Sequence, residues 1–299
     1  MICNAKALSF HTVTVADKVP YLSLAMAERS PSADHAFANL YLWNEIYHQE
    51  IAFCEERALV RFQTDGQYQY LYPIGKGPLK PVLEAMLAAD PQLRLSAVTE
   101  DELSNILADF PDTFDVFETR DIADYLYSAR SLATLSGKKL HGKRNHINAF
   151  TAANVWTVKP LTPADFDACR HILDIWATLH EGSAVRNERL AAERAFAAYD
   201  ALELYGALLI ANETPVAFTV GSMLTADTMC VHFEKALPDI QGAYPMINRE
   251  FVRMMQTQHP SLATVNREDD MGIENLRTAK LSYRPERLLR KFSLRVKSR

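Results

Sequence analysis

The segment 228–255 most constrains the fold, because it reads as a strand, a short loop and an amphipathic helix in immediate succession. Alternation along the strand predicts that Cys230, His232 and Glu234 share one face. A strand that leads into a helix N-terminus is a natural place for an anionic group, since unpaired N–H groups and the helix dipole both point there. A strand–helix turn that holds no ligand is the alternative.

The length and the cysteines limit the class of protein. A chain of 299 residues suggests about two domains, and a core of that size needs no disulfide or metal. The four cysteines are scattered without a C-x-x-C pair, which predicts neither a zinc site nor a disulfide framework and fits a reducing compartment. With no signal-like start and no apolar run of about 18 residues, we expect a cytoplasmic protein without a transmembrane segment.

The net charge of −5 is unevenly distributed. Residues 1–137 carry 10 Lys and Arg against 19 Asp and Glu, whereas residues 138–299 carry 22 against 18. The basic excess lies in 138–144 and 277–299. Such clusters form solvated faces or hold phosphates, and composition leaves both open.

The two halves of the chain share an order of predicted elements: a strand meander, a glycine-containing loop, a helix, a strand, a helix and a strand. Such an order predicts an α+β fold with mixed sheets that carry helices on both faces. The predicted first-half elements are strands 51–55, 58–63 and 67–74, helix 79–89, strand 93–98, a helix capped at Thr99, and strands 114–119 and 125–128. The predicted second-half elements are strand 156–159, helices 162–180 and 188–201, strands 204–211, 215–223 and 228–235, the following helix, strand 262–267, helix 272–282 and strand 290–296.

Three segments carry a resemblance to a known family: 137–150, 232–248 and 272–285, the last reading Gly-Ile-Glu-Asn-Leu-Arg-Thr-Ala-Lys-Leu-Ser-Tyr-Arg-Pro. They resemble a bacterial family related to the C-terminal catalytic domain of phosphatidylglycerol lysyltransferase, which has a tandem GNAT-like acyltransferase fold. The resemblance covers about residues 30–296. It implies a structural GNAT-like domain at 1–136, a basic linker at 137–154 and an active-site GNAT-like domain at 155–299.

The loops depart from the acetyl-CoA pattern of that superfamily, Arg/Gln-x-x-Gly-x-Gly/Ala. The second domain has Asp239 at the leading position and Tyr244 at the last, and the first domain keeps Gly75 and Gly77 but begins with Tyr72. A bulky side chain at the last position obstructs close backbone approach to a pyrophosphate. These departures favour a likeness to the relatives that use aminoacyl-tRNA, which also depart from the CoA pattern. The sequence lacks the membrane segment of the lipid-modifying enzymes, which argues against a lipid acceptor.

The resemblance implies a transferase that moves an acyl or aminoacyl group from acyl-CoA or aminoacyl-tRNA to an amine or hydroxyl acceptor. No tightly bound cofactor and no metal are expected. The acceptor would be a small molecule or a peptide, and tRNA is a candidate partner. The alternative is a catalytically degenerate GNAT-like protein that binds RNA or a partner.

Acyl transfer needs a base, donors for the oxyanion and an acid for the leaving group. We assign Glu234 as the base and His232 as the residue that orients the base or titrates itself; the alternatives are a charged residue at a sheet edge and a structural histidine. The resemblance implies that Tyr283 is the acid, because many members of the superfamily place a general-acid tyrosine there; the alternative is a core aromatic. The loop and the helix start predict donor binding by Gly242, Ala243, Tyr244 and Asn248, and the alternative is a turn without a ligand. The resemblance implies further donor-binding residues, which otherwise belong to a helix face and a solvated linker: Lys280, Arg284, Lys143, Arg144 and Asn145. The predicted acceptor-binding residues, which otherwise belong to a helix-capping loop, are Arg267, Asp269 and Asp270.

Overall fold

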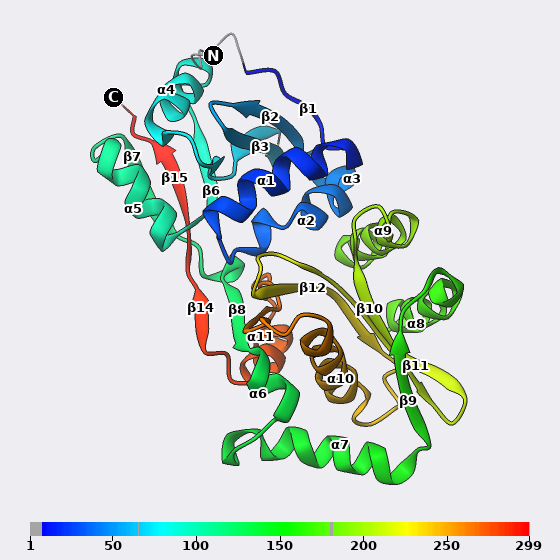
Figure 1. Ribbon diagram of the computed structural model, residues 1–299. Helices are drawn as coiled ribbons and strands as arrows, with labels where there is room; N and C mark the ends of the chain where they lie inside the picture. The colour runs from blue at the N-terminus through cyan, green and yellow to red at the C-terminus, as the bar shows by residue number, and fades with distance from the viewer. Residues whose placement is uncertain (1–7, 65, 180–181, 299) are drawn as a thin grey trace. The chain divides into compact units, whose positions relative to one another are not determined.

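The chain forms two sheets, and each sheet includes a strand from the other half of the sequence (Figure 1). The computed structural model describes residues 8–64, 66–179 and 182–298. The chain divides into two compact units. The first contains the residues up to Asp124, together with Asp269–Gly272 and the residues from Leu288 onward, and the second contains Tyr125–Glu268 and Ile273–Arg287.

The first unit is built on a mainly antiparallel sheet in the order β1-β2-β3-β4-β6-β15-β7, with β5 paired to β3. Its strands are β1 (His11–Thr12), β2 (Glu50–Cys54), β3 (Arg57–Thr64), β4 (Gln67–Tyr70), β5 (Ile74–Gly75), β6 (Arg94–Thr99), β7 (Phe114–Glu118) and β15 (Lys291–Val296). Its α-helices are α1 (Lys18–Glu28), α2 (Phe37–Leu42), α3 (Asn44–Tyr47), α4 (Leu79–Ala89) and α5 (Glu100–Asp109).

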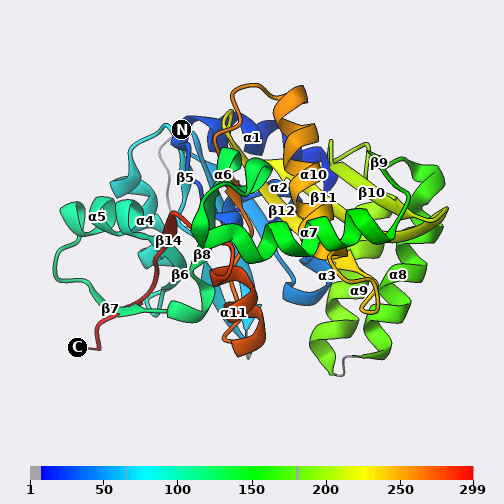
Figure 2. The same cartoon turned by 90° about the horizontal axis from the view of Figure 1, so that it is seen from below.

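The second unit is built on a seven-stranded sheet in the order β14-β8-β13-β12-β11-β10-β9. Its strands are β8 (Asp124–Ser128), β9 (Trp156–Pro160), β10 (Tyr205–Ala211), β11 (Thr214–Met223), β12 (Thr228–Ala236), β13 (Thr264–Asn266) and β14 (Arg287–Leu289). Its helices are α6 (Ala129–Thr134), α7 (His141–Ala153), α8 (Phe166–Thr178), α9 (Ser183–Ala197), α10 (Ala243–Gln258) and α11 (Glu274–Leu281). In this unit α10 covers one face of β10–β12, and α8 and α9 lie on the other face (Figures 1 and 2).

The two sheets follow the same plan. Each sheet begins with a meander of antiparallel strands, which a glycine-containing loop and a helix follow. The next strand then pairs in parallel with the last strand of the meander: β6 pairs with β4 in the first sheet, and β13 pairs with β12 in the second. The strand beyond that parallel pair comes from the other half of the chain: β15 lies between β6 and β7, and β8 lies beside β13. The predicted element order is confirmed, but the units do not divide at 137–154, and the last strand belongs to the first sheet.

Local signals explain several boundaries. The Thr99 hydroxyl accepts a hydrogen bond from the Glu102 N–H, and the Glu102 carboxylate accepts one from the Thr99 N–H, so the predicted capping box at α5 is confirmed. In the first-half loop, a Cβ on Gly77 would lie 1.7 Å from the Glu55 carbonyl oxygen. This glycine is therefore required for packing against the β2–β3 turn, whatever else approaches the loop.

Other boundaries differ from the predictions. Helix α11 ends at Leu281, so Tyr283 and Arg284 lie beyond it, and Arg284 adopts a left-handed conformation with φ of 59°. Helix α1 was not predicted. Cys54 is disulfide-bonded, which the scattered spacing of the cysteines did not indicate.

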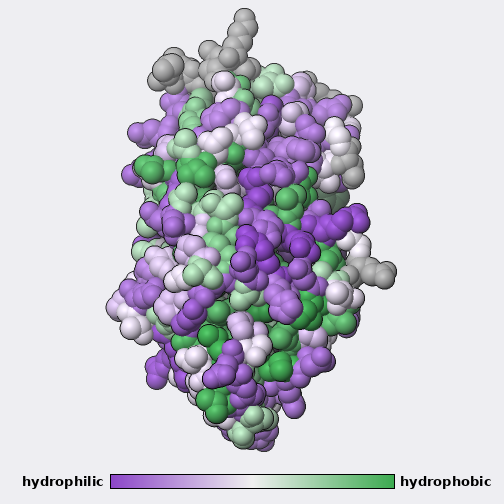
Figure 3. Space-filling view, turned by 90° about the vertical axis from the view of Figure 1, so that its right-hand side faces the viewer, coloured by the Kyte–Doolittle hydropathy of each residue, from purple (hydrophilic) through white to green (hydrophobic). Residues whose placement is uncertain are grey.

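Within residues 8–64, 66–179 and 182–298, no helix is long and apolar enough to cross a membrane. One face of the molecule carries hydrophilic residues interspersed with smaller groups of hydrophobic ones (Figure 3).

Candidate functional site

A β-bulge in β12 separates two residues that alternation placed together. Val220 pairs with Phe233, but the next residue of β11, Gly221, pairs with Val231, so His232 is an extra residue in β12. Such an insertion shifts the alternation of the residues that follow it. The prediction that His232 and Glu234 share a face is therefore wrong.

Glu234 faces α10 and is nearly buried. Its Oε2 accepts a hydrogen bond from Asn248 Nδ2 of α10 at 2.8 Å, and its Oε1 pairs with Arg267 Nη2 at 2.8 Å. The Glu234 side chain is only 8% exposed. On the other face, the neighbouring Lys235 pairs with Glu188 of α9 at 2.6 Å.

Two aromatic rings and a lysine complete this cluster. The Arg267 guanidinium carbon lies 4.7 Å from the centre of the Tyr283 ring and 5.7 Å from that of Tyr127. The Lys143 ammonium, which comes from α7, lies 3.9 Å from the Tyr283 ring centre. We call Glu234, Asn248, Arg267, Tyr283, Tyr127 and Lys143 the α10-face cluster.

Burial and charge shift the titration of this cluster. Burial and, to a smaller extent, the Arg267 charge lower the pKa of Lys143 to about 8, although the Glu234 charge opposes both. Burial would lower the pKa of Arg267 too, but the Glu234 carboxylate raises it overall. Burial raises the pKa of Tyr283 well above that of an ordinary phenol. At neutral pH the cluster thus holds a charged guanidinium and a protonated phenol.

Two buried polar atoms of the cluster have no hydrogen-bond partner. One is Asn248 Oδ1, on a residue that is 1% exposed, and the other is Arg267 Nη1. The first is an acceptor and the second a donor, and both residues bind the same Glu234 carboxylate. Unpaired buried polar groups are uncommon in folded proteins, so an acceptor and a donor on two residues that bind one carboxylate are candidates to bind a substrate or an ordered water.

The cluster lies where two strands of the sheet stop pairing. The parallel pairing of β12 with β13 ends at Cys230 and Asn266, whereas β12 continues to Ala236. Beyond that point Arg267 spans from the end of β13 to Glu234. A polar site is therefore placed where the two strands cease to pair.

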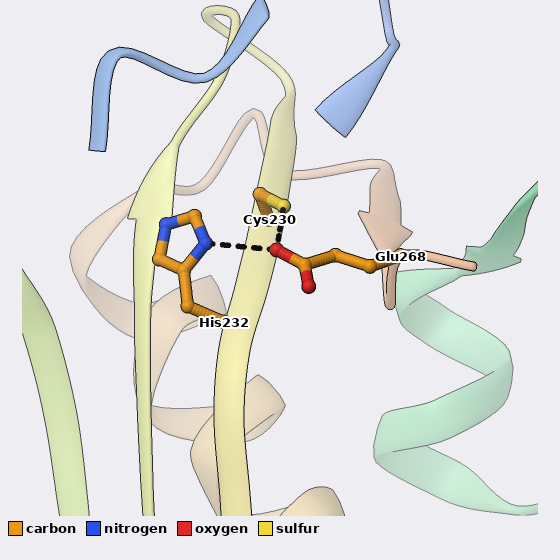
Figure 4. A group of neighbouring side chains, drawn as sticks. All are labelled: Cys230, His232 and Glu268. Atoms are coloured by element: carbon orange, nitrogen blue, oxygen red, sulfur yellow. Dashed lines mark hydrogen bonds and ion pairs between the residues drawn. The ribbon is translucent and has the colours of Figure 1, made fainter. Parts of the chain in front are cut away.

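His232 belongs to a different group of side chains. Its Nε2 lies 2.9 Å from Ser222 Oγ of β11. Its Nδ1 lies 3.0 Å from Glu268 Oε1, and Figure 4 shows these two side chains facing each other. Cys230 Sγ lies 3.6 Å from the same Glu268 oxygen. Ser222 pairs with Cys230 across the two strands and directly follows Gly221 in β11. A Cβ on Gly221 would meet Phe251 of α10, so the Gly221 side of the strand faces α10. The Ser222 group thus lies on the sheet face opposite α10.

The loop before α10 is packed against α7. Gly242 has φ of 84°, and a Cβ there would lie 2.4 Å from the His146 carbonyl oxygen. Ala243 is fully buried. Tyr244 is 37% exposed, and burial of its hydroxyl, which is hydrogen-bonded to the Ala236 backbone, raises its pKa to about 12.

The other predicted donor-binding residues have internal contacts or point elsewhere. Lys280 Nζ donates to the Arg267 carbonyl at 2.5 Å, and Arg284 is exposed beyond the end of α11. Arg144 donates to the carbonyls of Leu135 and Gly137, and Asn145 Nδ2 contacts His141 within α7. Of the basic linker residues 143–145, only Lys143 joins the α10-face cluster.

Two of the predicted acceptor-binding residues belong to the first unit. Asp270 is fully buried, pairs with Arg120 at 3.1 Å and accepts a hydrogen bond from the Gly272 N–H. Asp269 accepts one from the Met271 N–H. Both carboxylates therefore stabilise their own loop, and only Arg267 of the three lies in the α10-face cluster.

Sequence reasoning missed three residues near these groups. Tyr127 comes from β8, whose place in the second sheet depends on strand exchange and leaves no local signal. Ser222 and Glu268 were not singled out either. Spacing alone does not distinguish Glu268 from Asp269 and Asp270, the two aspartates that follow it.

Comparison with known proteins defines the class. The family described as phosphatidylglycerol lysyltransferase, C-terminal, matches residues 17–295, and the chain belongs to this family. The fold is that of two tandem GNAT-like domains. The family points to an aminoacyl- or acyltransferase.

Three solved structures are similar to this chain. A conserved protein of unknown function from Bacteroides thetaiotaomicron is 35% identical, with a TM-score of 0.89 over 97% of this chain and 100% of that one. The C-terminal domain of a putative lysylphosphatidylglycerol synthetase from Agrobacterium fabrum is 15% identical, with a TM-score of 0.64 over 94% and 92% of the chains. A tandem GNAT protein from the clavulanic acid biosynthesis pathway is 10% identical, with a TM-score of 0.51 over 97% and 98%.

One curated relative also matches. An uncharacterised protein of Mycoplasmoides gallisepticum is 26% identical over 209 residues, or 68% of this chain. The match spans 66% of that relative's length.

Proposed function

We propose that this protein transfers an aminoacyl group from an aminoacyl-tRNA to an amine or hydroxyl acceptor at the α10-face cluster. The family to which the chain belongs is described as a lysyltransferase, which supports aminoacyl chemistry. The observation that carries the proposal is the pair of unpartnered buried atoms, Asn248 Oδ1 and Arg267 Nη1, beside Glu234. A substrate that offers one donor and one acceptor would satisfy both.

Each residue has a role that suits its chemistry. Glu234 accepts the proton of the attacking amine or hydroxyl as the new bond to the acyl carbon forms. The Arg267 Nη1 donor stabilises the negative charge that develops on the carbonyl oxygen. Tyr283, which is protonated at neutral pH, gives its proton to the departing ribose oxygen as the ester bond breaks.

The loop before α10 supports this donor over acyl-CoA. The space that Gly242 leaves is taken by the backbone of α7 at His146. A pyrophosphate that needs close approach to that glycine would compete with α7. An aminoacyl ester at the end of a tRNA does not require a pyrophosphate pocket.

The test uses binding and turnover together. The purified full-length protein is melted with aminoacyl-tRNA and, separately, with acyl-CoA; a ligand at 100 times its Kd adds about 2.7 kcal/mol of stability. Transfer of a radiolabelled amino acid to a panel of amines and hydroxyl compounds is then measured. Glu234→Gln should abolish transfer without abolishing binding, while Glu274→Gln, at an exposed position of α11, is the matched control. If acyl-CoA stabilises the protein and aminoacyl-tRNA does not, the proposed donor is wrong and acyl-CoA takes its place.

Lys143 gives the proposal a pH signature. Because its pKa is about 8, its ammonium is charged below that pH and neutral above it. If Lys143 contacts the donor's phosphates, affinity for aminoacyl-tRNA should fall as pH rises through about 8. Lys143→Met should remove this inflection, and Lys139→Met, at an exposed position, should retain it. An unchanged inflection in Lys143→Met would remove Lys143 from the donor site.

A second candidate function is a degenerate GNAT-like module that binds RNA or a partner. One observation favours it: both Glu234 oxygens are already engaged and the side chain is nearly buried. RNA binding that falls steeply with salt and is unchanged in a Glu234→Gln, Tyr283→Phe variant, together with no transfer, would support this function over the enzyme.

A further inference from the structure

We infer that Cys230, His232 and Glu268 form a binding site for a divalent transition metal of the zinc type. The three side chains come from β12 and from the residue that follows Arg267 (Figure 4). Their ligand atoms all lie within 4.8 Å of one another. This site lies on the sheet face opposite the α10-face cluster, so it does not rest on the proposed function.

The donor set selects the class of metal. A thiolate, an imidazole nitrogen and a carboxylate oxygen are each established zinc ligands, and the mixture of soft and borderline donors disfavours magnesium or calcium. Glu268 Oε1 lies 3.0 Å from His232 Nδ1 and 3.6 Å from Cys230 Sγ. These are separations of the size found between neighbouring ligands around one tetrahedral ion with bonds of about 2.0–2.3 Å.

The surroundings suit a bound cation. The His232 side chain is fully buried and Cys230 is buried, while the Glu268 side chain is 24% exposed and gives access from solvent. A thiolate and a carboxylate together neutralise a divalent ion, so the loaded site carries no net charge in its buried part. Three protein ligands leave a fourth position for water on the exposed side of Glu268.

Ser222 orients the imidazole. With the metal on Nδ1, the Nε2–H of His232 donates to Ser222 Oγ, which lies at 2.9 Å. Such a partner on the remaining ring nitrogen fixes the tautomer of a metal-bound histidine. With the imidazole neutral and Glu268 a carboxylate before loading, the imidazole proton moves from Nδ1 to Nε2 and the Cys230 thiol proton goes to solvent, so one proton leaves for each ion bound.

The β-bulge builds this arrangement. The extra residue at His232 turns Glu234 to the α10 face while Cys230 and His232 stay on the opposite one. Glu268, in a left-handed conformation with φ of 56°, directs its carboxylate back to β12. The histidine and the glutamate are 36 positions apart in the sequence, so no spacing motif reveals the group.

The test is direct titration of the chelator-treated full-length protein with Co²⁺ and with Zn²⁺. We expect one equivalent of Co²⁺ to produce a near-ultraviolet thiolate-to-cobalt absorption band, which Zn²⁺ displaces. Cys230→Ser should abolish the band, whereas Cys169→Ser, at the other buried free cysteine, should keep it. Glu268→Gln keeps the side-chain volume and should weaken Zn²⁺ affinity by 100-fold or more, and Ser222→Ala by about 10- to 100-fold.

Several results would overturn the site. The unaltered protein could fail to bind Co²⁺ stoichiometrically. The band could also persist in Cys230→Ser, or disappear in Cys169→Ser instead. If Cys230→Ser does not fold, Glu268→Gln decides, because an unchanged Zn²⁺ affinity there would exclude the carboxylate ligand. Activity of the transferase is not needed for any of these readouts.

Discussion

The pairing of Glu234 with Arg267 yields a prediction whose size follows from burial. Their side chains are 8% and 13% exposed and their charged atoms are 2.8 Å apart. Removing one partner leaves the other charge buried without compensation, which costs about 3–5 kcal/mol. We therefore expect Glu234→Leu and Arg267→Met each to lower the free energy of unfolding by about that amount.

The double variant distinguishes a coupled pair from two separate packing losses. With both charges removed no buried charge is stranded, so the double variant should lose less than the sum of the single losses by about 2–3 kcal/mol. Urea unfolding followed by tryptophan fluorescence measures this. A Trp43→Phe background leaves Trp156 and Trp176 as reporters, and both lie in the second unit.

The control is an exposed ion pair of similar distance. Arg290 and Glu118 are 47% and 42% exposed and lie 2.6 Å apart, and solvent screening should leave their removal with little effect on the urea midpoint. The reasoning about the Glu234–Arg267 pair is refuted if Glu234→Leu and Arg267→Met each lower the free energy of unfolding by under about 1 kcal/mol and their effects add.

Three further predictions concern the fold. Gly242→Ala should destabilise by more than about 1 kcal/mol in urea unfolding, because φ is 84° and the Cβ would meet the α7 backbone, whereas Gly142→Ala within α7 should stabilise by up to about 1 kcal/mol. Lys291→Met should cost about 3–5 kcal/mol in the same assay, since it strands two carboxylate partners of a fully buried ammonium. A fragment of residues 125–289 should show cooperative unfolding by circular dichroism, and 155–299 should not, because only the first contains β8; equal cooperativity would contradict the strand exchange.

Elements with local signals could be predicted from the sequence. Helix α4 has the bounds expected from its apolar spacing, Leu79–Ala89, and the capping box at Thr99 begins α5. The meander strands also lie within a few residues of their predicted places, because turn residues and alternation are local properties. Such signals describe neighbours along the chain, and these elements depend on little else.

The unpredicted features depend on partners that are distant in sequence. The strand at 125–128 was expected, but nothing in those residues reveals that β13 is its neighbour. One inserted residue at His232 reverses the face of everything after it, and alternation cannot detect it because both registers look alike along β12. Arg144 was expected to bind phosphate, whereas the carbonyls it contacts become neighbours only once the chain turns before α7.

The bulge and the end of β13 together explain how one strand supports two polar groups. Arg267 and Glu268 are consecutive, yet the first pairs with Glu234 on the α10 face and the second with His232 on the opposite face. The extra residue in β12 allows both pairings, because it places the two β12 partners on opposite faces of the sheet. Since Arg267 and Glu268 share a peptide bond, a contact that fixes Glu268 also restricts the backbone that carries Arg267. The buried network around Glu234 and the Cys230–His232–Glu268 group are therefore mechanically joined through the chain that leaves β13.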